Sequence, residues 1–180
     1  TGEGGVGQNR LDEQHTVATN VNLYILGGVI GNGSKNVLYA PITSGTIGNW
    51  KVTSKLQVVR YLHTRCTQNG YVYAMGGSDG ISTRNDVEYA QVQADGSLNA
   101  WATTTSFTTP RAYAGTATYN GYVYISGGCA VDLGLAGASS CGASTLTDVQ
   151  FAQINANGTL SAWTTTQSLP VARYLHVSSA

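Results

Sequence analysis

Short stretches of apolar and aromatic residues alternate with polar ones along the chain and are separated by glycine-containing turns. In the middle of the sequence this alternation predicts strands at 62–68, 71–75, 86–93 and 98–105. Asn69-Gly70 divides the first two and Asp95-Gly96 the last two, and both dipeptides are typical of two-residue type I′ hairpin turns. No segment has the 3.6-residue period of a helix. The pattern therefore predicts four consecutive antiparallel strands.

The same pattern occurs three times. The stretches NLYILGG (22–28), YVYAMGG (71–77) and YVYISGG (122–128) align on their glycine pairs, and Ser44-Gly45 and Asn157-Gly158 replace Asp95-Gly96 in the other copies. The tryptophans and one set of arginines both step by 51 and then 62 residues: Trp50, Trp101, Trp163 and Arg60, Arg111, Arg173. A four-stranded repeat of this length predicts an all-β protein, a β-propeller whose copies are antiparallel blades.

The repeat resembles a known family. A glycine pair after an aromatic-rich strand, then a Tyr or Phe, then a Trp is similar to the kelch repeat. The phrases YAQVQADGSLNAW (89–101) and FAQINANGTLSAW (151–163) resemble, more narrowly, the kelch-like blades of bacterial surface and secreted proteins. The resemblance covers about residues 11–180 and implies the propeller fold, but propellers host many activities.

The spacings of the tryptophans and of the arginines also predict the boundaries of the units. We expect an irregular segment at 1–10, blade 1 at 11–59, blade 2 at 60–110, blade 3 at 111–172 with an insertion at 129–147, and the first strand of a next blade at 173–180. The first copy has no Arg at the matching position and one residue fewer between Tyr39 and Trp50. Because propellers close with four to eight blades, we expect further blades of the same protein, or another copy of the chain, to complete the ring. The single strand at 173–180 favours the first.

Residues found in every copy are predicted to serve the fold, because a functional site is usually unique. The tryptophans are expected to pack between blades, and the glycine pairs to lie where the backbone bends or approaches a neighbour. These pairs are Gly27 and Gly28, Gly76 and Gly77, and Gly127 and Gly128. His63 and His176 share one repeat position, with His15 nearby, which favours a structural role over a copper or zinc centre. Cys66 is predicted to be a small buried side chain.

Composition narrows the functional classes. The chain of 180 residues has zero formal net charge and only 10% charged residues, without a basic run, so no nucleic-acid partner is expected. No apolar run approaches the roughly 20 residues of a membrane span. Few charges, many small residues and eleven tyrosines favour a secreted or cell-surface protein.

No enzymatic centre is predicted. Sialidase-like propellers carry Asp boxes, but Asp95 is followed directly by glycine, so the spacing fails. Galactose-oxidase-like enzymes need Tyr and His ligands and a Cys bonded to a Tyr, and no placement here identifies that centre. We expect no catalytic residue, no metal ligand and no cofactor. A fragment of a propeller enzyme, either a glycan-active hydrolase or a copper oxidase, and a structural subunit of a surface assembly stay open as alternatives.

Variation between copies is confined to one set of connections, at 29–35, 78–85 and 129–147. Variable loops on a rigid scaffold are typical of a recognition surface, so this face, with the connections between blades, is predicted to bind a protein or a glycan. The candidate binding residues are Asp79, Arg84, Asn85, Asp132, Leu133 and Leu135. Cys129 and Cys141 close a 13-residue segment, and a disulfide there would imply an oxidising compartment. A neutral insertion is the alternative.

Overall fold

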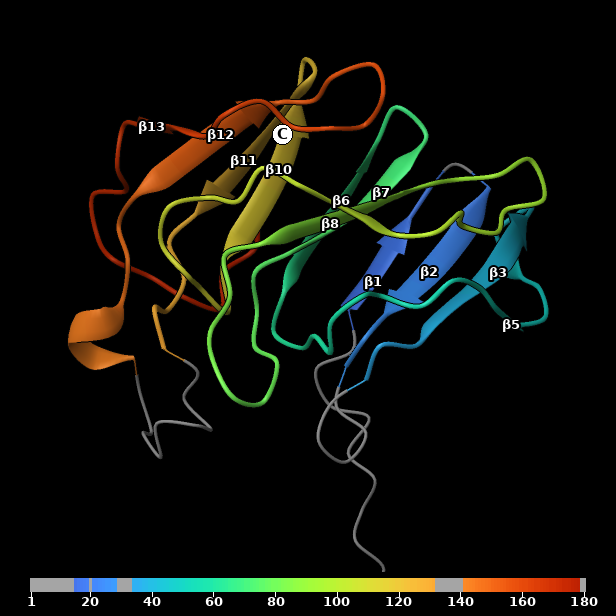
Figure 1. The fold of residues 1–180 in the computed structure, drawn as a ribbon, viewed down its shortest axis with the longest axis horizontal. Coiled ribbons are helices and arrows are strands. Elements are labelled where there is room, and N and C mark those ends of the chain that lie inside the picture. The colour runs from blue at the N-terminus through green and yellow to red at the C-terminus, as the bar shows by residue number, and fades with distance from the viewer. Residues whose placement is uncertain (1–14, 20, 29–33, 132–140, 179–180) are drawn as a thin grey trace, which may run out of the picture.

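Three antiparallel sheets make up the part of the chain that the computed structural model describes, residues 15–19, 21–28, 34–131 and 141–178 (Figure 1). Sheet 1 consists of β1 (His15–Ala18), β2 (Asn22–Leu26), β3 (Val37–Thr43), β4 (Thr46–Ile47) and β5 (Lys51–Val52). Sheet 2 consists of β6 (Thr64–Gln68), β7 (Tyr71–Met75), β8 (Val87–Gln91) and β9 (Ala102–Thr104). Sheet 3 consists of β10 (Gly115–Tyr119), β11 (Tyr122–Ser126), β12 (Val149–Gln153) and β13 (Thr164–Thr166).

Helical structure in the described ranges is limited to η1 (Gly142–Ser144), a single 3-10 turn. None of the helical residues described forms a segment long and apolar enough to cross a membrane. The all-β, four-stranded antiparallel prediction is thus confirmed for sheets 2 and 3. Sheet 1 has the extra strand β4, paired with the end of β3.

Strand register repeats from sheet to sheet. Opposite residues of the second and third strands are aromatic in each sheet: Tyr24 and Tyr39, Tyr73 and Tyr89, Tyr124 and Phe151. Their ring centroids lie 6.2, 6.1 and 5.9 Å apart. Aromatic cross-strand pairs stabilise a sheet and pin its register, so the repeat seen in the sequence is also a repeat of the structure.

Two kinds of hairpin turn connect the strands. Both central residues have positive φ at Ser44-Gly45, Asn69-Gly70 and Asn120-Gly121, as type I′ turns require. The prediction of the same turn at Asp95-Gly96 and Asn157-Gly158 is wrong, because only the glycine has positive φ there.

In these wider loops the side chain of the residue before the glycine accepts hydrogen bonds from the residue after the glycine. Asp95 Oδ1 accepts hydrogen bonds from Ser97 N at 2.9 Å and Ser97 Oγ at 2.6 Å, and the loop closes through Gln93 N to Ser97 O at 2.8 Å. The residue missing from the first copy is explained by this difference. Ser44-Gly45 turns in two residues where sheet 2 uses the three residues 94–96.

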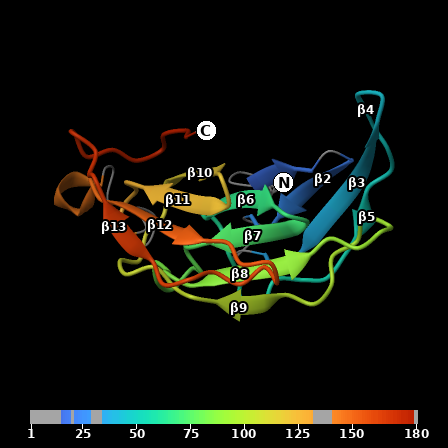
Figure 2. The ribbon, with the colours of Figure 1, turned by 90° about the horizontal axis from the view of Figure 1, so that it is seen from above.

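The sheets are arranged as a fan (Figure 2). The first strands β1, β6 and β10 contact one another in order, and β5, β9 and β13 lie on the outside of the arc. One apolar cluster joins sheets 1 and 2, including Tyr24, Leu26, Val72 and Ala74. A second cluster joins sheets 2 and 3, including Tyr73, Met75, Val123 and Ile125. Sheet 2 thus buries both faces against its neighbours, while sheets 1 and 3 each bury one face against sheet 2, and burial of this apolar surface holds the fan together.

The tryptophans pack as predicted where a preceding sheet is described. Trp101 is 4% exposed, lies in the cluster between sheets 1 and 2 and donates from Nε1 to Ser54 O at 3.1 Å. Trp163 packs against the second cluster and donates to Thr105 O at 2.9 Å. Trp50 differs, since it is 44% exposed on the outer side of sheet 1.

The glycine pairs lie where one unit meets the next. All six glycines have positive φ, and a Cβ on Gly76 would lie 2.7 Å from Arg111 O. The second glycine of each pair donates its N–H to the carbonyl of a repeated arginine: Gly28 to Arg60 at 3.0 Å, Gly77 to Arg111 at 2.8 Å, and Gly128 to Arg173 at 2.9 Å. The expectation of close backbone approach is confirmed.

The segment after sheet 3 runs beside β10. Leu175 N donates to Tyr113 O at 2.9 Å, and Ser126 Oγ lies 2.9 Å from His176 Nε2. No strand is assigned within 173–178, although a strand was predicted at 173–180. A strand needs a ladder partner, and in the described chain the backbone of this segment bonds to the connections at Tyr113, Gly128 and Leu146 instead.

Candidate functional site

The variable connections lie together at one end of the fan. Because all three sheets are antiparallel in sequence order, the type I′ hairpins fall at one end and the connections after the glycine pairs at the other. At that end, isolated β-bridges link a connection between two sheets to a connection within a sheet: Tyr61 pairs with Ser78, and Ala112 pairs with Cys129. Ser78 also pairs with Thr83, and Cys129 with Thr145, inside the same connection. We refer to this end as the connection face.

Asp79 organises the loop 78–85. Its Oδ1 accepts hydrogen bonds from Ile81 N at 2.9 Å and Ser82 N at 2.8 Å, and its Oδ2 from Arg84 Nη1 at 2.7 Å. Burial by itself raises the pKa of this carboxyl, but the hydrogen bonds from Ser82, Ile81 and Arg84 outweigh it and hold the pKa below its ordinary value. Ile81 at the tip is 88% exposed.

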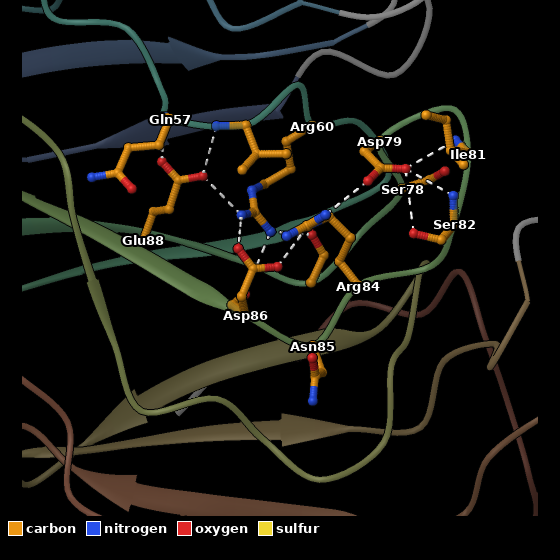
Figure 3. A network of polar contacts seen from close by, with 12 residues as sticks. Gln57, Arg60, Ser78, Asp79, Ile81, Ser82, Arg84, Asn85, Asp86 and Glu88 are labelled. Carbon is orange, nitrogen blue, oxygen red and sulfur yellow. Dashed lines mark hydrogen bonds and ion pairs between the residues drawn. The ribbon is translucent and has the colours of Figure 1, made fainter.

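A line of alternating charges continues from this loop into the protein (Figure 3). Arg84 Nε donates to Asp86 Oδ1 at 2.6 Å, and Arg60 Nη2 bonds both Asp86 Oδ2 at 2.6 Å and Glu88 Oε1 at 2.9 Å. The side chains of Arg60 and Glu88 are fully buried. Burial raises the pKa of Asp86, but the charge of Arg60 and the hydrogen bonds from both arginines hold it below its ordinary value.

The predicted binding residues therefore serve the loop itself. Asp79 and Arg84 are ion-paired to each other, and Asn85 Nδ2 donates to Phe107 O at 2.8 Å. Figure 3 shows Asn85 directed away from the charged line. Asp132, Leu133 and Leu135 lie outside the described residues. The structure brings Asp79 and Arg84 together, and their interaction fixes the shape of the surface around Ile81.

The long insertion is closed by a disulfide. Cys129 and Cys141 are bonded, with their Cα atoms 5.8 Å apart, and both residues are buried. Cys129 occupies the repeat position of Ser78, directly after the glycine pair. The other cysteine, Cys66, is buried and free as predicted, and burial raises the pKa of its thiol to about 12.

A hollow of about 240 Å³ lies on the connection face where three consecutive units converge. It is lined by Leu62, His63, Arg65, Tyr113, Ala114, Leu175 and His176. A second hollow of about 250 Å³ shares three of these residues and extends over polar side chains of the first strands, including Thr64, Thr116 and Ser178. The hollows follow the inner edge of the fan, where equivalent residues of successive units face one another.

Strained residues form the rim of the first hollow. Leu62, Tyr113 and Leu175 hold one repeat position and have φ of 55°, 58° and 56°. A side chain in this left-handed region costs about 1–2 kcal/mol. The strain is held by a relay of backbone bonds, from Tyr113 N to Leu62 O at 3.1 Å and from Leu175 N to Tyr113 O at 2.9 Å.

The histidines line this hollow from two of its units. His63 is 1% exposed. Burial lowers the pKa of His176, and the nearby Arg173 lowers it further, so the ring is neutral at pH 7. Across the described ranges, no group of three or more His, Cys, Asp or Glu side chains is placed to hold a metal ion.

The described candidate binding residues Asp79, Arg84 and Asn85 lie on the connection face but do not line the first hollow. The rim residues Leu62, Tyr113 and Leu175 were not singled out, although a signal was present: each lies two residues after a repeated arginine. Left-handed φ at a non-glycine residue has no clear mark in the sequence.

No protein-family model matches the chain, and no curated protein matches it.

Proposed function

We propose that the chain is part of a kelch-like β-propeller and serves as a non-enzymatic binding or scaffold module, which recognises a protein or a glycan through its connection face. The supporting observation is the hollow of about 240 Å³ at the meeting of three units. Its lining combines the Tyr113 ring with aliphatic and histidine side chains and with Arg65. A concave, mainly apolar site with a few polar groups suits a sugar ring or an inserted side chain.

The rigid surroundings support this proposal. The charged line from Asp79 to Glu88 fixes the neighbouring loop, and the disulfide anchors the base of the insertion. Preformed surfaces lose less conformational entropy on binding. The disulfide also supports a secreted or cell-surface location, because disulfides persist in oxidising compartments.

A test fills the hollow with a larger side chain at Ala114, which also packs against the cluster between sheets 2 and 3, so the fold of each variant is compared with the wild type by circular dichroism. Ala114 is a partly exposed residue of the lining, and A114W would occupy the space with an indole. The matched control is A94W, since Ala94 is exposed in the wide hairpin loop at the opposite end. The full chain and both variants would be applied to a glycan array and to a displayed peptide library.

We expect wild-type binding to one of these probe classes, reduced at least about tenfold by A114W, which is a loss of about 1.4 kcal/mol, and unchanged by A94W. Retention on the glycan array would assign a glycan, and retention of peptides would assign a protein. Equal loss with both variants, or no retained probe in either library, would contradict the proposed function.

A further inference from the structure

Arg60 and Arg111 each have two attachments, one through the backbone and one through the side chain. The backbone of Arg60 bonds to sheet 1, through Gly28 N to Arg60 O at 3.0 Å and Arg60 N to Ser34 O at 3.2 Å. Its side chain enters sheet 2, where Nη1 donates to Gly76 O at 2.6 Å and Nη2 to Asp86 and Glu88. The arginine thus ties one sheet to the next.

Arg111 repeats this arrangement one unit later. Its backbone bonds to Gly77 N at 2.8 Å and Arg84 O at 2.9 Å of sheet 2. Its side chain enters sheet 3, where Nη1 donates to Gly127 O at 2.8 Å and both terminal nitrogens bond the carboxylate of Asp148 at 3.0 and 2.7 Å. Arg60 and Arg111 are 0% and 1% exposed. We call the position occupied by each guanidinium a socket.

Each socket that is filled by an arginine contains an acidic residue that binds the guanidinium. Asp86 and Asp148 hold this position in sheets 2 and 3, and Asn36 holds it in sheet 1, where no arginine occurs at the matching place in the sequence. Glu88 has Leu38 as its sheet 1 counterpart. A groove of about 290 Å³ lies at that site, lined by Ile25, Gly27, Ser34, Asn36, Leu38, Val52 and Lys55. Arginine and carboxylate therefore vary together within the chain.

Arg173 has only the first of the two attachments. Its backbone bonds to sheet 3 as its counterparts do, through Gly128 N at 2.9 Å and Leu146 O at 3.3 Å. Its side chain is exposed, and within the described residues its only polar contact is a 3.5 Å bond from Nε to Val171 O. The backbone of Arg173 is therefore bound to sheet 3, while its guanidinium has no acidic partner within the described residues.

The outer face of sheet 3 is also not covered by another unit within the described residues. Tyr24 and Tyr73 are fully buried and donate their hydroxyls to the next unit, to Gly96 O and Gly158 O at 2.8 Å each. Their counterpart Tyr124 remains partly exposed, as do Val149 and Phe151 beside it. Leu175 and Val177, next to Arg173, are 69% and 95% exposed.

We propose that the edge formed by Arg173 and the outer face of sheet 3 is a docking surface for a fourth unit of the same repeat, which continues the chain and carries an acid at the Asp86 position. Charge decides the occupant. A buried guanidinium without a carboxylate is strongly destabilising, and the two arginines that are buried in the described part of the chain, Arg60 and Arg111, each have one. The inference is separate from ligand binding on the connection face.

A second copy of the chain offers a poorer fit. Docked head to tail, it would present its sheet 1 groove to Arg173, and there Asn36, Leu38 and Val52 replace the acids and Thr103 of sheet 2. Gly27 O could accept one hydrogen bond, but the positive charge would be buried against aliphatic side chains.

The test adds a unit with and without its acids. Residues 173–176 repeat residues 60–63 letter for letter, RYLH, so residues 177–180 can be replaced by a second copy of 64–110. The acidic extension keeps Asp and Glu at the copied positions, and the neutral extension has D86N and E88L in the added copy only, the pair found in sheet 1. Each is made with Arg173 and with R173Q, and urea unfolding and limited proteolysis are measured.

We expect the acidic extension to be protected from protease and R173Q to lower its folding equilibrium constant about a hundredfold, the effect of breaking a buried ion pair. R173Q should not lower the folding equilibrium constant of the neutral extension, because Arg173 has no carboxylate to lose there, and it should change that of the 180-residue chain less than threefold. Equal effects on both extensions, or rapid digestion of both added units, would overturn the proposal.

Light scattering of the unmodified chain gives a readout that does not depend on the added unit. We expect R173Q to leave the molar mass unchanged. A wild-type oligomer that R173Q dissociates would show instead that a second copy occupies this edge, and the proposal would be wrong.

Discussion

Glu88 makes three contacts from a fully buried position. It accepts backbone hydrogen bonds from Gln57 N at 2.6 Å and Val58 N at 3.2 Å and pairs with Arg60. It therefore joins the connection between sheets 1 and 2 to the socket. Gln150 holds the equivalent position in sheet 3 and accepts one such bond, from Thr108 N at 3.2 Å.

We predict that E88L lowers the free energy of unfolding by about 3–5 kcal/mol, because two backbone amides lose their buried acceptor and Arg60 keeps only one of its two carboxylates. E88Q should cost less, since glutamine keeps an acceptor as Gln150 does. Urea unfolding measures both, with Q91L at the exposed end of the same strand as control. An E88L protein as stable as Q91L would contradict the prediction.

At the scale of elements, the connections differ while the strands repeat. The loop 78–85 is held by Asp79 and Arg84. The longer connection 129–147 uses a disulfide at its base and the turn η1 instead. Closing a loop of this size by a disulfide stabilises the folded state by about 3 kcal/mol in the chain-entropy model.

We predict that the double variant C129S/C141S loses about 3 kcal/mol of unfolding free energy, while the sheets keep their circular dichroism. Serine is a conservative choice, because Ser78 occupies the position of Cys129 in sheet 2. A thiol reductant should lower the stability of the wild type to that of the variant and leave the variant unchanged. A wild type that resists reductant-induced destabilisation with its disulfide open would exclude this role.

For the whole molecule, acid is expected to be destabilising. Burial raises the pKa of Asp79, Asp86 and Asp148, but ion pairs and hydrogen bonds outweigh it, so each pKa lies below its ordinary value in the folded protein. Such groups bind protons more weakly in the folded state than in the unfolded one. Their contribution is therefore complete above the ordinary aspartate pKa of about 4 and is lost as the pH falls through the folded values.

We predict that the unfolding free energy declines in two stages: below about pH 6.5, because His176 binds a proton less readily in the folded state than in the unfolded one, and again below about pH 4, where the three carboxyls become protonated. The D86N variant should be less stable at neutral pH and show a shallower decline, because it lacks one of the three carboxyls. Chemical denaturation at a series of pH values measures this. Equal stability at pH 3 and pH 7 would rule out the three carboxyls as stabilising groups.

Much of the fold could be predicted because it follows from local pattern repeated three times. Strand positions, the glycine pairs and the burial of Trp101 follow from alternation, turn chemistry and spacing. The failures have local causes too. Asp95-Gly96 resembles a two-residue turn, but the Asp95 side chain caps a wider loop, and sequence letters do not distinguish the two.

The sequence by itself determined the class of fold, the period and the end of the fan where variation gathers, since hydrophobic periodicity and positive-φ glycines act over a few residues. Only the tertiary structure decided which polar side chains bind one another within the protein and which surfaces stay exposed. Asp79 and Arg84 have the character of ligand-binding residues in the sequence, yet they pair with each other. Arg60, Arg111 and Arg173 look equivalent in the sequence. Whether the guanidinium of each has a partner depends on residues 16 to 37 positions away, which no local pattern encodes.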